Sequence, residues 1–205
     1  CKPNKEAQAR LITVVEDVED IPGTALHEGV KWDWESFPEY MDAVERFPRA
    51  IDVAAQVPHC AVRTYVMGER GSKNEMATPA DVASMAAIVK EGIEHGALGF
   101  TTSRTELHTT GGDQAMPGTY ADEAELLGIG KVIGELGGKG IFGLVSDFHN
   151  WEQEMDWMKR LSIDNNCQVN FVLFFREEKD WDRVLKQLDY CRRARAEGAL
   201  LIPHV

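Results

Sequence analysis

The chain has 205 residues, 43% of them hydrophobic and 27% charged, a composition typical of a globular protein with a substantial core. Lys and Arg number 22 and Asp and Glu 34, so the formal net charge is -12. That balance repels a phosphate backbone and argues against nucleic acid as a partner. The longest apolar runs fall well short of the roughly 20 residues of a membrane-spanning helix, so no membrane segment is expected.

The cysteines lack the spacing of a metal knuckle or a CxxC motif, which favours free thiols in a reducing compartment and predicts a cytoplasmic protein. They are Cys1, Cys60, Cys167 and Cys191. The chain begins without an initiator Met or a signal peptide and stops inside an apolar run. We therefore expect residues 1–205 to be an internal fragment of a single catalytic barrel domain, inactive and poorly soluble on its own.

The first predicted helix follows Ser36, which is spaced to form a capping box with Glu39. Trp32 and Trp34, just before this helix, form either an aromatic wall of a site or a staple packed on the outside of the fold. A second helix is expected from a Thr78 N-cap to a glycine at position 96. Its apolar residues share one face at positions 82, 85, 86, 89 and 93.

Five short apolar or β-branched runs are predicted strands, and helical segments alternate with them. The strands are expected at residues 51–57, 97–102, 140–146, 169–175 and 199–205, with the last two helices beginning near Trp151 and Trp181. This alternation predicts an α/β fold with a parallel sheet. A doubly wound sheet would carry a Gly-rich nucleotide-binding turn, which is absent, so we favour part of a (β/α)8 TIM-type barrel.

Polar side chains follow the predicted strands, where parallel strands of a barrel build the active site. They are His59, Arg63, Ser103, Arg104, His108, Asp147, His149 and Arg176, with His204 inside the last strand. Several imidazoles near a carboxylate suit a divalent metal such as zinc, which lowers the pKa of bound water.

Each of these residues has more than one interpretation. Asp147 can bind metal, orient a base, or cap the helix that begins near Trp151. Arg63 and Arg104 can each hold a substrate carboxylate in a bidentate geometry or form an internal salt bridge. A thiolate–imidazole pair of Cys60 with its neighbour His59 is disfavoured, because adjacent residues at a strand end point in opposite directions.

Several stretches together resemble the N-acyl-D-amino-acid deacylases (D-aminoacylases), a branch of the metal-dependent amidohydrolase superfamily. They are residues 18–23, 34–40, 57–63 with 66–68, and 94–105. The resemblance implies a zinc-dependent (β/α)8 barrel in which the five predicted strands are the third to the seventh. It also implies that the catalytic Asp, acting as general base, belongs to an eighth strand beyond Val205, so the catalytic residues within this chain are unknown.

The resemblance also suggests individual site residues. The family's metal histidines end its fifth and sixth strands, where this chain has Asp147 with His149 and, on the next strand, Phe174 and Phe175. Asp147 and His149 are therefore the expected metal ligands, since phenylalanine cannot coordinate. The expected substrate-binding residues are His59 and Arg63, which match a His-x-x-x-Arg block of the family, together with Ser103 and Arg104.

The function implied is hydrolysis of the amide bond of N-acyl-D-amino acids, or of related small linear amides, by a metal-activated water. One alternative is a cyclic-amide hydrolase of the dihydropyrimidinase type, although no bridging Lys stands near Thr101. Another is a catalytically inactive amidohydrolase-like binding subunit, favoured by the altered ends of the fifth and sixth strands.

Overall fold

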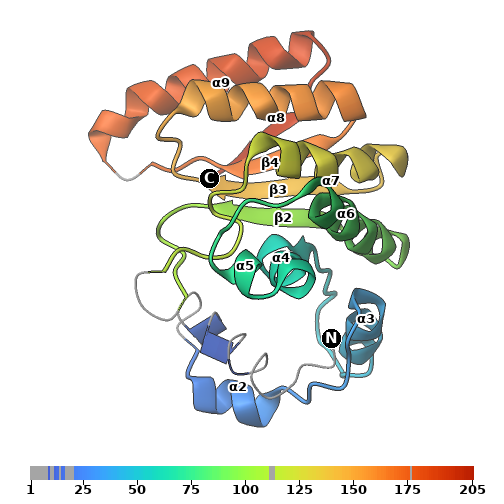
Figure 1. The fold of residues 1–205 in the computed structure, drawn as a ribbon. Coiled ribbons are helices and arrows are strands. Elements are labelled where there is room, and N and C mark those ends of the chain that lie inside the picture. The colour runs from blue at the N-terminus through green and yellow to red at the C-terminus, as the bar shows by residue number, and fades with distance from the viewer. Residues whose placement is uncertain (1–8, 10–11, 14, 17–20, 111–113, 176) are drawn as a thin grey trace.

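The computed structural model describes residues 9, 12–13, 15–16, 21–110, 114–175 and 177–205. Its strands form a single five-stranded parallel sheet (Figure 1). In chain order they are β1 (Val57–Pro58), β2 (Gly99–Arg104), β3 (Ile141–Ser146), β4 (Gln168–Val172) and β5 (Leu201–His204).

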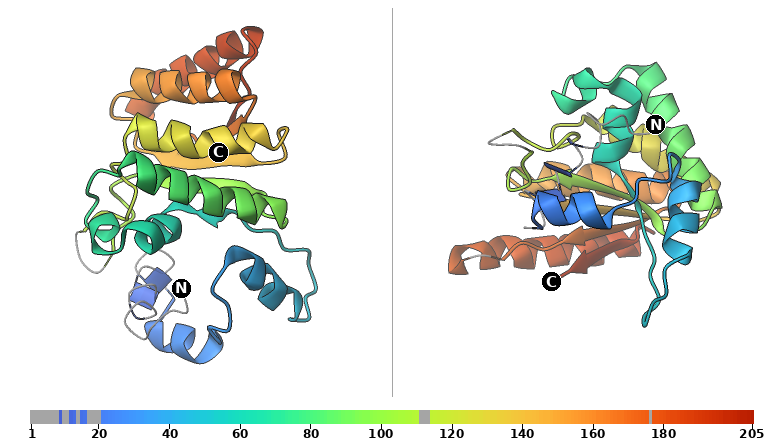
Figure 2. Two further views of the ribbon diagram at one scale, coloured as in Figure 1. Left: turned by 45° about the vertical axis from the view of Figure 1, so that its right-hand side comes forward. Right: turned by 90° about the horizontal axis from the view of Figure 1, so that it is seen from below.

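Helices connect the strands and cover one side of the sheet. They are α2 (Gly23–Gly29), α3 (Phe37–Glu45), α4 (His59–Met67), α5 (Glu69–Ser72), α6 (Pro79–Glu94), α7 (Glu123–Glu135), α8 (Trp151–Asn165), the 3-10 turn η1 (Glu178–Asp180) and α9 (Trp181–Ala196). Figures 1 and 2 show α6, α7, α8 and α9 in a row along the sheet, with α2 lying apart from it. Within the described residues, no helix is long and apolar enough to span a membrane.

The strand order identifies the architecture. Each strand pairs in parallel with the next one in sequence, in the order β1-β2-β3-β4-β5. A doubly wound sheet reverses its order at a switch point, whereas a barrel adds every new strand on the same side of the previous one. The sheet is therefore part of a (β/α)8 barrel, and the fold class expected from the sequence is confirmed.

The two faces of the sheet differ in composition. Phe100, Phe142, Val169 and Leu201 are in register across four strands and are buried beneath the helices. The neighbouring row is also in register, consists of Thr101, Gly143, Asn170 and Ile202, and points to the opposite face, which we call the open face. The hydrophobic core thus lies between the sheet and the helices, while the open face carries polar and small side chains.

Both predicted helix starts are confirmed. The Ser36 side chain accepts a hydrogen bond from the Glu39 N–H, and the Glu39 carboxylate accepts one from the Ser36 N–H. Thr78 and Asp81 form the same reciprocal box at the start of α6. The glycine at position 96 has φ +102, the left-handed region that favours glycine after a helix.

The predicted strand at 51–57 is wrong over most of its length. β1 contains only Val57 and Pro58, and Ile51 and Val53 are 76% and 48% exposed. The pairing is short because β1 lies at the sheet edge and the chain turns into α4 directly after Pro58. Two other strands are also shorter than predicted, since β4 ends at Val172 rather than at residue 175 and β5 covers only Leu201–His204.

Candidate functional site

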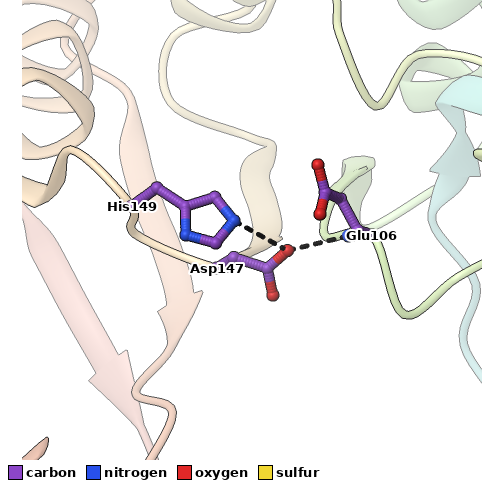
Figure 3. Close-up of side chains that lie close together, drawn as sticks. All are labelled: Glu106, Asp147 and His149. Carbon is purple, nitrogen blue, oxygen red and sulfur yellow. Dashed lines mark hydrogen bonds and ion pairs between the residues drawn. The ribbon is translucent and has the colours of Figure 1, made fainter.

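Three side chains that can bind a cation meet at the carboxyl edge of the sheet. Glu106, Asp147 and His149 each offer one ligand atom, and these atoms lie within 4.8 Å of one another (Figure 3). Asp147 and His149 follow β3, whereas Glu106 comes from the connection after β2. The structure thus brings the two predicted metal ligands together and adds Glu106, which sequence reasoning did not single out. We refer to these three residues as the edge cluster.

Hydrogen bonds to both carboxylate oxygens hold Asp147 in place. The Thr105 hydroxyl donates a 2.7 Å hydrogen bond to Oδ1, and the Glu106 backbone N–H donates another of 2.7 Å to Oδ2. Nε2 of His149 lies 3.9 Å from the same Oδ2. Asp147 does not cap α8, because the N-cap position there belongs to Asn150. Of the interpretations considered for Asp147, helix capping is therefore wrong.

The local sequence explains why His149 lies beside Asp147. Phe148 has φ +54, and its N–H donates to the Ser146 hydroxyl, so the chain turns sharply at the end of β3. The Phe148 ring is buried and contacts Phe171 edge to face. This anchored ring leaves His149, the next residue, with 78% of its side chain exposed.

The donor set of the edge cluster suits a divalent cation. Zinc binds imidazole nitrogen and carboxylate oxygen at about 2.0–2.2 Å in a tetrahedral arrangement, so two ligands of one ion lie about 3.4 Å apart. The 3.9 Å separation of Asp147 and His149 is slightly longer than this, and a rotation of the exposed His149 side chain can close the difference. A carboxylate has about four lone-pair positions, and Asp147 uses two of them for Thr105 and Glu106. The residues present therefore fit a zinc ion, and the exposed Glu106 carboxylate completes the set after a small shift.

Ser103 and Arg104 are neighbours in β2 and lie on opposite faces of the sheet. Arg104 faces the helices, where Nε and Nη2 each donate a 2.9 Å hydrogen bond to Glu154 and Nη1 donates to the Ala121 carbonyl. Its guanidinium also lies over the Trp157 ring. Arg104 thus forms the internal salt bridge that was one of its two interpretations, and its predicted substrate contact stays a prediction.

Ser103 lies on the open face, and its hydroxyl is 2.8 Å from Nδ1 of His108. Thr105, which holds Asp147, follows two residues after Ser103 in the chain. This placement is compatible with the predicted substrate-binding role of Ser103.

His59 and Arg63 lie one helical turn apart on α4, which begins directly after β1. Both side chains are about 1% exposed. His59 Nε2 and Arg63 Nε each lie 2.8 Å from Oε1 of Glu125 in α7. Arg63 also donates to the backbone carbonyls of Gly71 and Glu75. The two residues thus form a buried ion cluster, and direct contact with substrate stays a prediction for them.

Burial controls the protonation of this ion cluster. Burial lowers the pKa of His59, against the opposing effect of its hydrogen bond to Glu125. Burial alone raises the pKa of Glu125, but the hydrogen bonds from His59 and Arg63 bring its pKa below the usual value. Since a carboxylate only accepts, His59 donates to Glu125 through Nε2 and can accept from the Thr102 hydroxyl, which is 2.8 Å from Nδ1.

The remaining residues noted in the sequence lie elsewhere. Burial raises the pKa of the Cys60 thiol, so this residue stays protonated, as expected if it forms no thiolate–imidazole pair with His59. Trp32 stacks on Trp34, which in turn contacts Tyr40, so this aromatic group packs at the start of α3. His204 ends β5, and Arg176 lies outside the described residues.

Comparison with known proteins places this architecture in a family. The chain belongs to the amidohydrolase family, whose profile matches residues 3–198. Among curated proteins it is 32% identical over 81 residues to a D-aminoacylase of Alcaligenes xylosoxydans xylosoxydans, covering 40% of this chain and 16% of the relative. It is 30% identical over 126 residues to an uncharacterized protein of Mycobacterium tuberculosis, covering 58% and 20%.

Solved structures share the fold. A D-aminoacylase structure that addresses a binuclear metal centre superposes with a TM-score of 0.70 at 19% identity, covering 90% of this chain and 36% of the other. An N-acyl-D-glutamate deacylase from Bordetella bronchiseptica, complexed with zinc and a phosphonate inhibitor, gives a TM-score of 0.66 at 22% identity, with 82% and 33% covered. The chain thus spans about a fifth of the curated relatives and a third of these structures.

Proposed function

We propose that this chain belongs to the catalytic barrel of a metal-dependent hydrolase that cleaves the amide bond of N-acyl-D-amino acids. The observation that carries the proposal is the edge cluster, because it sits at the carboxyl edge of a parallel amidohydrolase sheet, where barrel enzymes place their chemistry. Family membership and the fold shared with deacylases support the same reaction class.

In this proposal Asp147, His149 and Glu106 hold the cation. When bound, a zinc ion supplies Lewis-acid polarisation of the amide carbonyl and activation of water. The protein's own contribution is placement: Thr105 and the Glu106 N–H fix the Asp147 carboxylate before any ligand arrives. Ser103 and His108 offer hydrogen-bonding groups to a substrate on the open face.

The test measures amine release by the whole protein that contains this barrel domain, from N-acetyl-D-amino acids, from their L enantiomers and from hydantoins. We expect turnover of the D compounds, loss of turnover after chelation, and recovery on adding zinc. Asp147→Asn should reduce kcat/KM by about 100-fold or more, since even partners that only orient a metal ligand cost about 10- to 100-fold when they are changed. Asp164→Asn, a matched change at an exposed site on α8, should leave kcat/KM unchanged.

The remaining outcomes separate the alternatives. Turnover of hydantoins alone would replace the proposal with a cyclic-amide hydrolase. Absence of both turnover and zinc binding would favour a binding subunit. The segment after β4 supports this alternative, because Phe175 contacts Trp181 there and offers no metal ligand.

A further inference from the structure

The connection between β2 and α7 folds back on itself. Thr109 forms an antiparallel bridge with Ala115, and the Met116 N–H donates a 3.0 Å hydrogen bond to the His108 carbonyl. We call the paired segments 108–110 and 114–116 the loop ladder. Because the two segments are joined by backbone hydrogen bonds, whatever fixes the returning segment also fixes the position of His108.

A side chain from a distant part of the sequence holds the returning segment. Asn74 lies between α5 and α6, and its Nδ2 donates to the carbonyls of Ala115 and Met116 at 3.1 and 3.2 Å. Its Oδ1 accepts a 2.8 Å hydrogen bond from the Gly118 N–H. These partners are 41, 42 and 44 residues away in sequence. One amide thus binds three backbone groups at the base of the loop ladder.

The backbone of Asn74 has a separate role that needs no amide. Asn74 has φ +56 and follows the end of α5, where its N–H donates to the Gly71 carbonyl and the Glu75 N–H donates to the Arg70 carbonyl. This pattern ends many helices, and glycine is the residue most common at its left-handed position. The helix end alone therefore does not explain the three hydrogen bonds of the Asn74 side chain.

Two further contacts hold the same connection against the helices. Gly118 has φ +100, and a Cβ atom there would lie 2.6 Å from Nδ1 of His59, so its backbone packs directly on the buried ion cluster. Nε2 of Gln114 donates a 2.8 Å hydrogen bond to the Ser72 carbonyl at the end of α5. The base of the loop ladder is therefore anchored to α4 and to the end of α5.

Hydrogen bonds lead from Asn74 to the open face of the sheet. Asn74 binds the carbonyl of Met116, the Met116 N–H binds the carbonyl of His108, and the His108 ring lies 2.8 Å from the Ser103 hydroxyl. The His108 side chain is half-buried, so its place beside Ser103 depends on the loop ladder that carries it. The Asn74 amide thus acts on His108 through a single intervening residue.

We propose that Asn74 is a positioning residue for substrate binding: through the loop ladder it holds the His108 imidazole beside Ser103, and this pair contacts the substrate. The inference rests on the proposed amide hydrolysis, because the substrate is that of the same site. Metal binding does not depend on Asn74, since Thr105 and the Glu106 N–H fix Asp147 directly. Loss of the Asn74 amide therefore affects KM and leaves the zinc affinity unchanged.

The variant Asn74→Gly separates the two roles of this residue, because glycine keeps the left-handed helix end and removes only the amide. The matched control is Asn166→Gly, since Asn166 has φ +48 and ends α8 with the same pair of backbone hydrogen bonds, immediately before β4. A purely structural role predicts the same result for both variants.

Kinetics of the whole protein that contains this barrel domain gives the first readout. For N-acetyl-D-amino acids, Asn74→Gly should raise KM about tenfold and change kcat by less than about twofold, because a substrate contact made equally in the ground and transition states is weakened. Asn166→Gly should change neither constant. Equal effects of both variants, or a fall in kcat at constant KM, would overturn the inference.

A spectroscopic readout is independent of turnover. In the same protein labelled with 15N-histidine, the ring signals of His108 are assigned by their loss in His108→Gln. We expect the shifts of a hydrogen-bonded Nδ1 in wild type and Asn166→Gly, and a clear change in Asn74→Gly. An unchanged His108 signal in Asn74→Gly would sink the inference. A changed signal in a protein that hydrolyses none of the compounds would retain the positioning of His108 and reject the proposed hydrolysis.

A second variant serves if Asn74→Gly does not fold. Gln114→Ala removes the exposed hydrogen bond from the loop ladder to the Ser72 carbonyl. It should raise KM and shift the His108 signal in the same direction as Asn74→Gly, by a smaller amount. Wild-type values of both KM and the His108 signal in Gln114→Ala would then count against the loop ladder as the element that positions His108.

Discussion

Nε2 of His59 lies 2.8 Å from Oε1 of Glu125, although 66 residues separate them in sequence. The pair joins α4 to α7 and, through Thr102, to β2. Arg63 donates to the same carboxylate oxygen, so one buried acid connects two bases. Losing one partner of a buried pair costs much stability. These contacts therefore hold α4 and α7 in place against β2.

The ion cluster predicts how stability depends on pH. The folded-state pKa values of His59 and Glu125 are both lowered, so at acid pH the unfolded chain binds more protons than the folded one. The free energy of unfolding should therefore fall as pH drops below 6.5, the ordinary pKa of histidine, and fall further below 4.5 as Glu125 is protonated. Each proton bound only in the unfolded state contributes a slope of about 1.4 kcal/mol per pH unit.

Denaturant unfolding of wild type and His59→Gln between pH 7.5 and 5 measures this slope. We expect the variant to be less stable at pH 7.5 but flatter across the range, since glutamine does not titrate. His95→Gln, which alters an exposed histidine at the end of α6, should keep the wild-type slope. Equal slopes for wild type and His59→Gln would exclude His59 as the titrating group.

Zinc should stabilise the fold through the edge cluster. A ligand that binds only the folded state raises stability by RT ln(1 + [L]/Kd), which is about 2.7 kcal/mol at a free zinc concentration of 100 times Kd. We expect a higher Tm with zinc for wild type and no such rise for His149→Gln. The exposed His27 in α2 provides the control variant His27→Gln. A zinc-induced rise that persists in His149→Gln would place the ion elsewhere.

The Arg104–Glu154 pair should contribute to the stability of the fold. The two side chains are 17% and 13% exposed and share a bidentate contact. Arg104→Ala leaves the largely buried Glu154 carboxylate without its cation and with a hydrogen bond from the Ser146 hydroxyl, and we expect a loss of about 3 kcal/mol in the free energy of unfolding. Asp189→Asn breaks an exposed pair with Arg192 and should cost less than about 1 kcal/mol. Similar losses for both variants would contradict the role assigned to Arg104.

Gly99 should tolerate no side chain. It has φ +146, and a Cβ atom there would lie 2.0 Å from the carbonyl oxygen of Ile141 in the adjacent strand. Gly99→Ala must push β2 and β3 apart, so we expect a loss of about 3 kcal/mol, the upper range for overpacking. Gly29→Ala meets nothing within 4 Å in α2 and should be neutral or slightly stabilising. Chemical denaturation of both variants gives the comparison.

The buried thiols should react slowly. Burial raises the pKa of both Cys167 and Cys191 to about 11, so almost no thiolate is present at pH 8. We expect iodoacetamide to modify these two residues at least about 100-fold more slowly in the native protein than in 6 M guanidinium, as read by peptide mass analysis. Rapid native labelling of Cys167 would show that the helix layer opens on the timescale of the reaction.

Much of the architecture could be predicted from local patterns. Ser36 with Glu39 and Thr78 with Asp81 mark helix starts because a capping box depends only on residues three apart. The start of α4 carries no such signal, since this helix begins at Pro58 and His59 without a side-chain cap.

The site was less accessible to sequence reasoning. Glu125 follows the Asp122 N-cap and has the position of an ordinary first-turn acid, so nothing local indicates that it pairs with His59 and Arg63. Glu106 joins the edge cluster because its own N–H binds Asp147, 41 residues away. Ser103 and Arg104 were both expected in the cleft, but strand alternation sends Arg104 to the helix side. Such tertiary pairings depend on register, which single-sequence patterns do not specify.

The strand order has a consequence for how the chain folds. From β2 onward each strand meets its partner after a connection with one α-helix, so pairing residues such as Gly99 and Ile141 lie about 40 residues apart. Parallel pairing over such separations is intrinsically slow, and synthesis proceeds from the N-terminus. Each strand–helix unit can therefore join the growing sheet in chain order as the polypeptide leaves the ribosome.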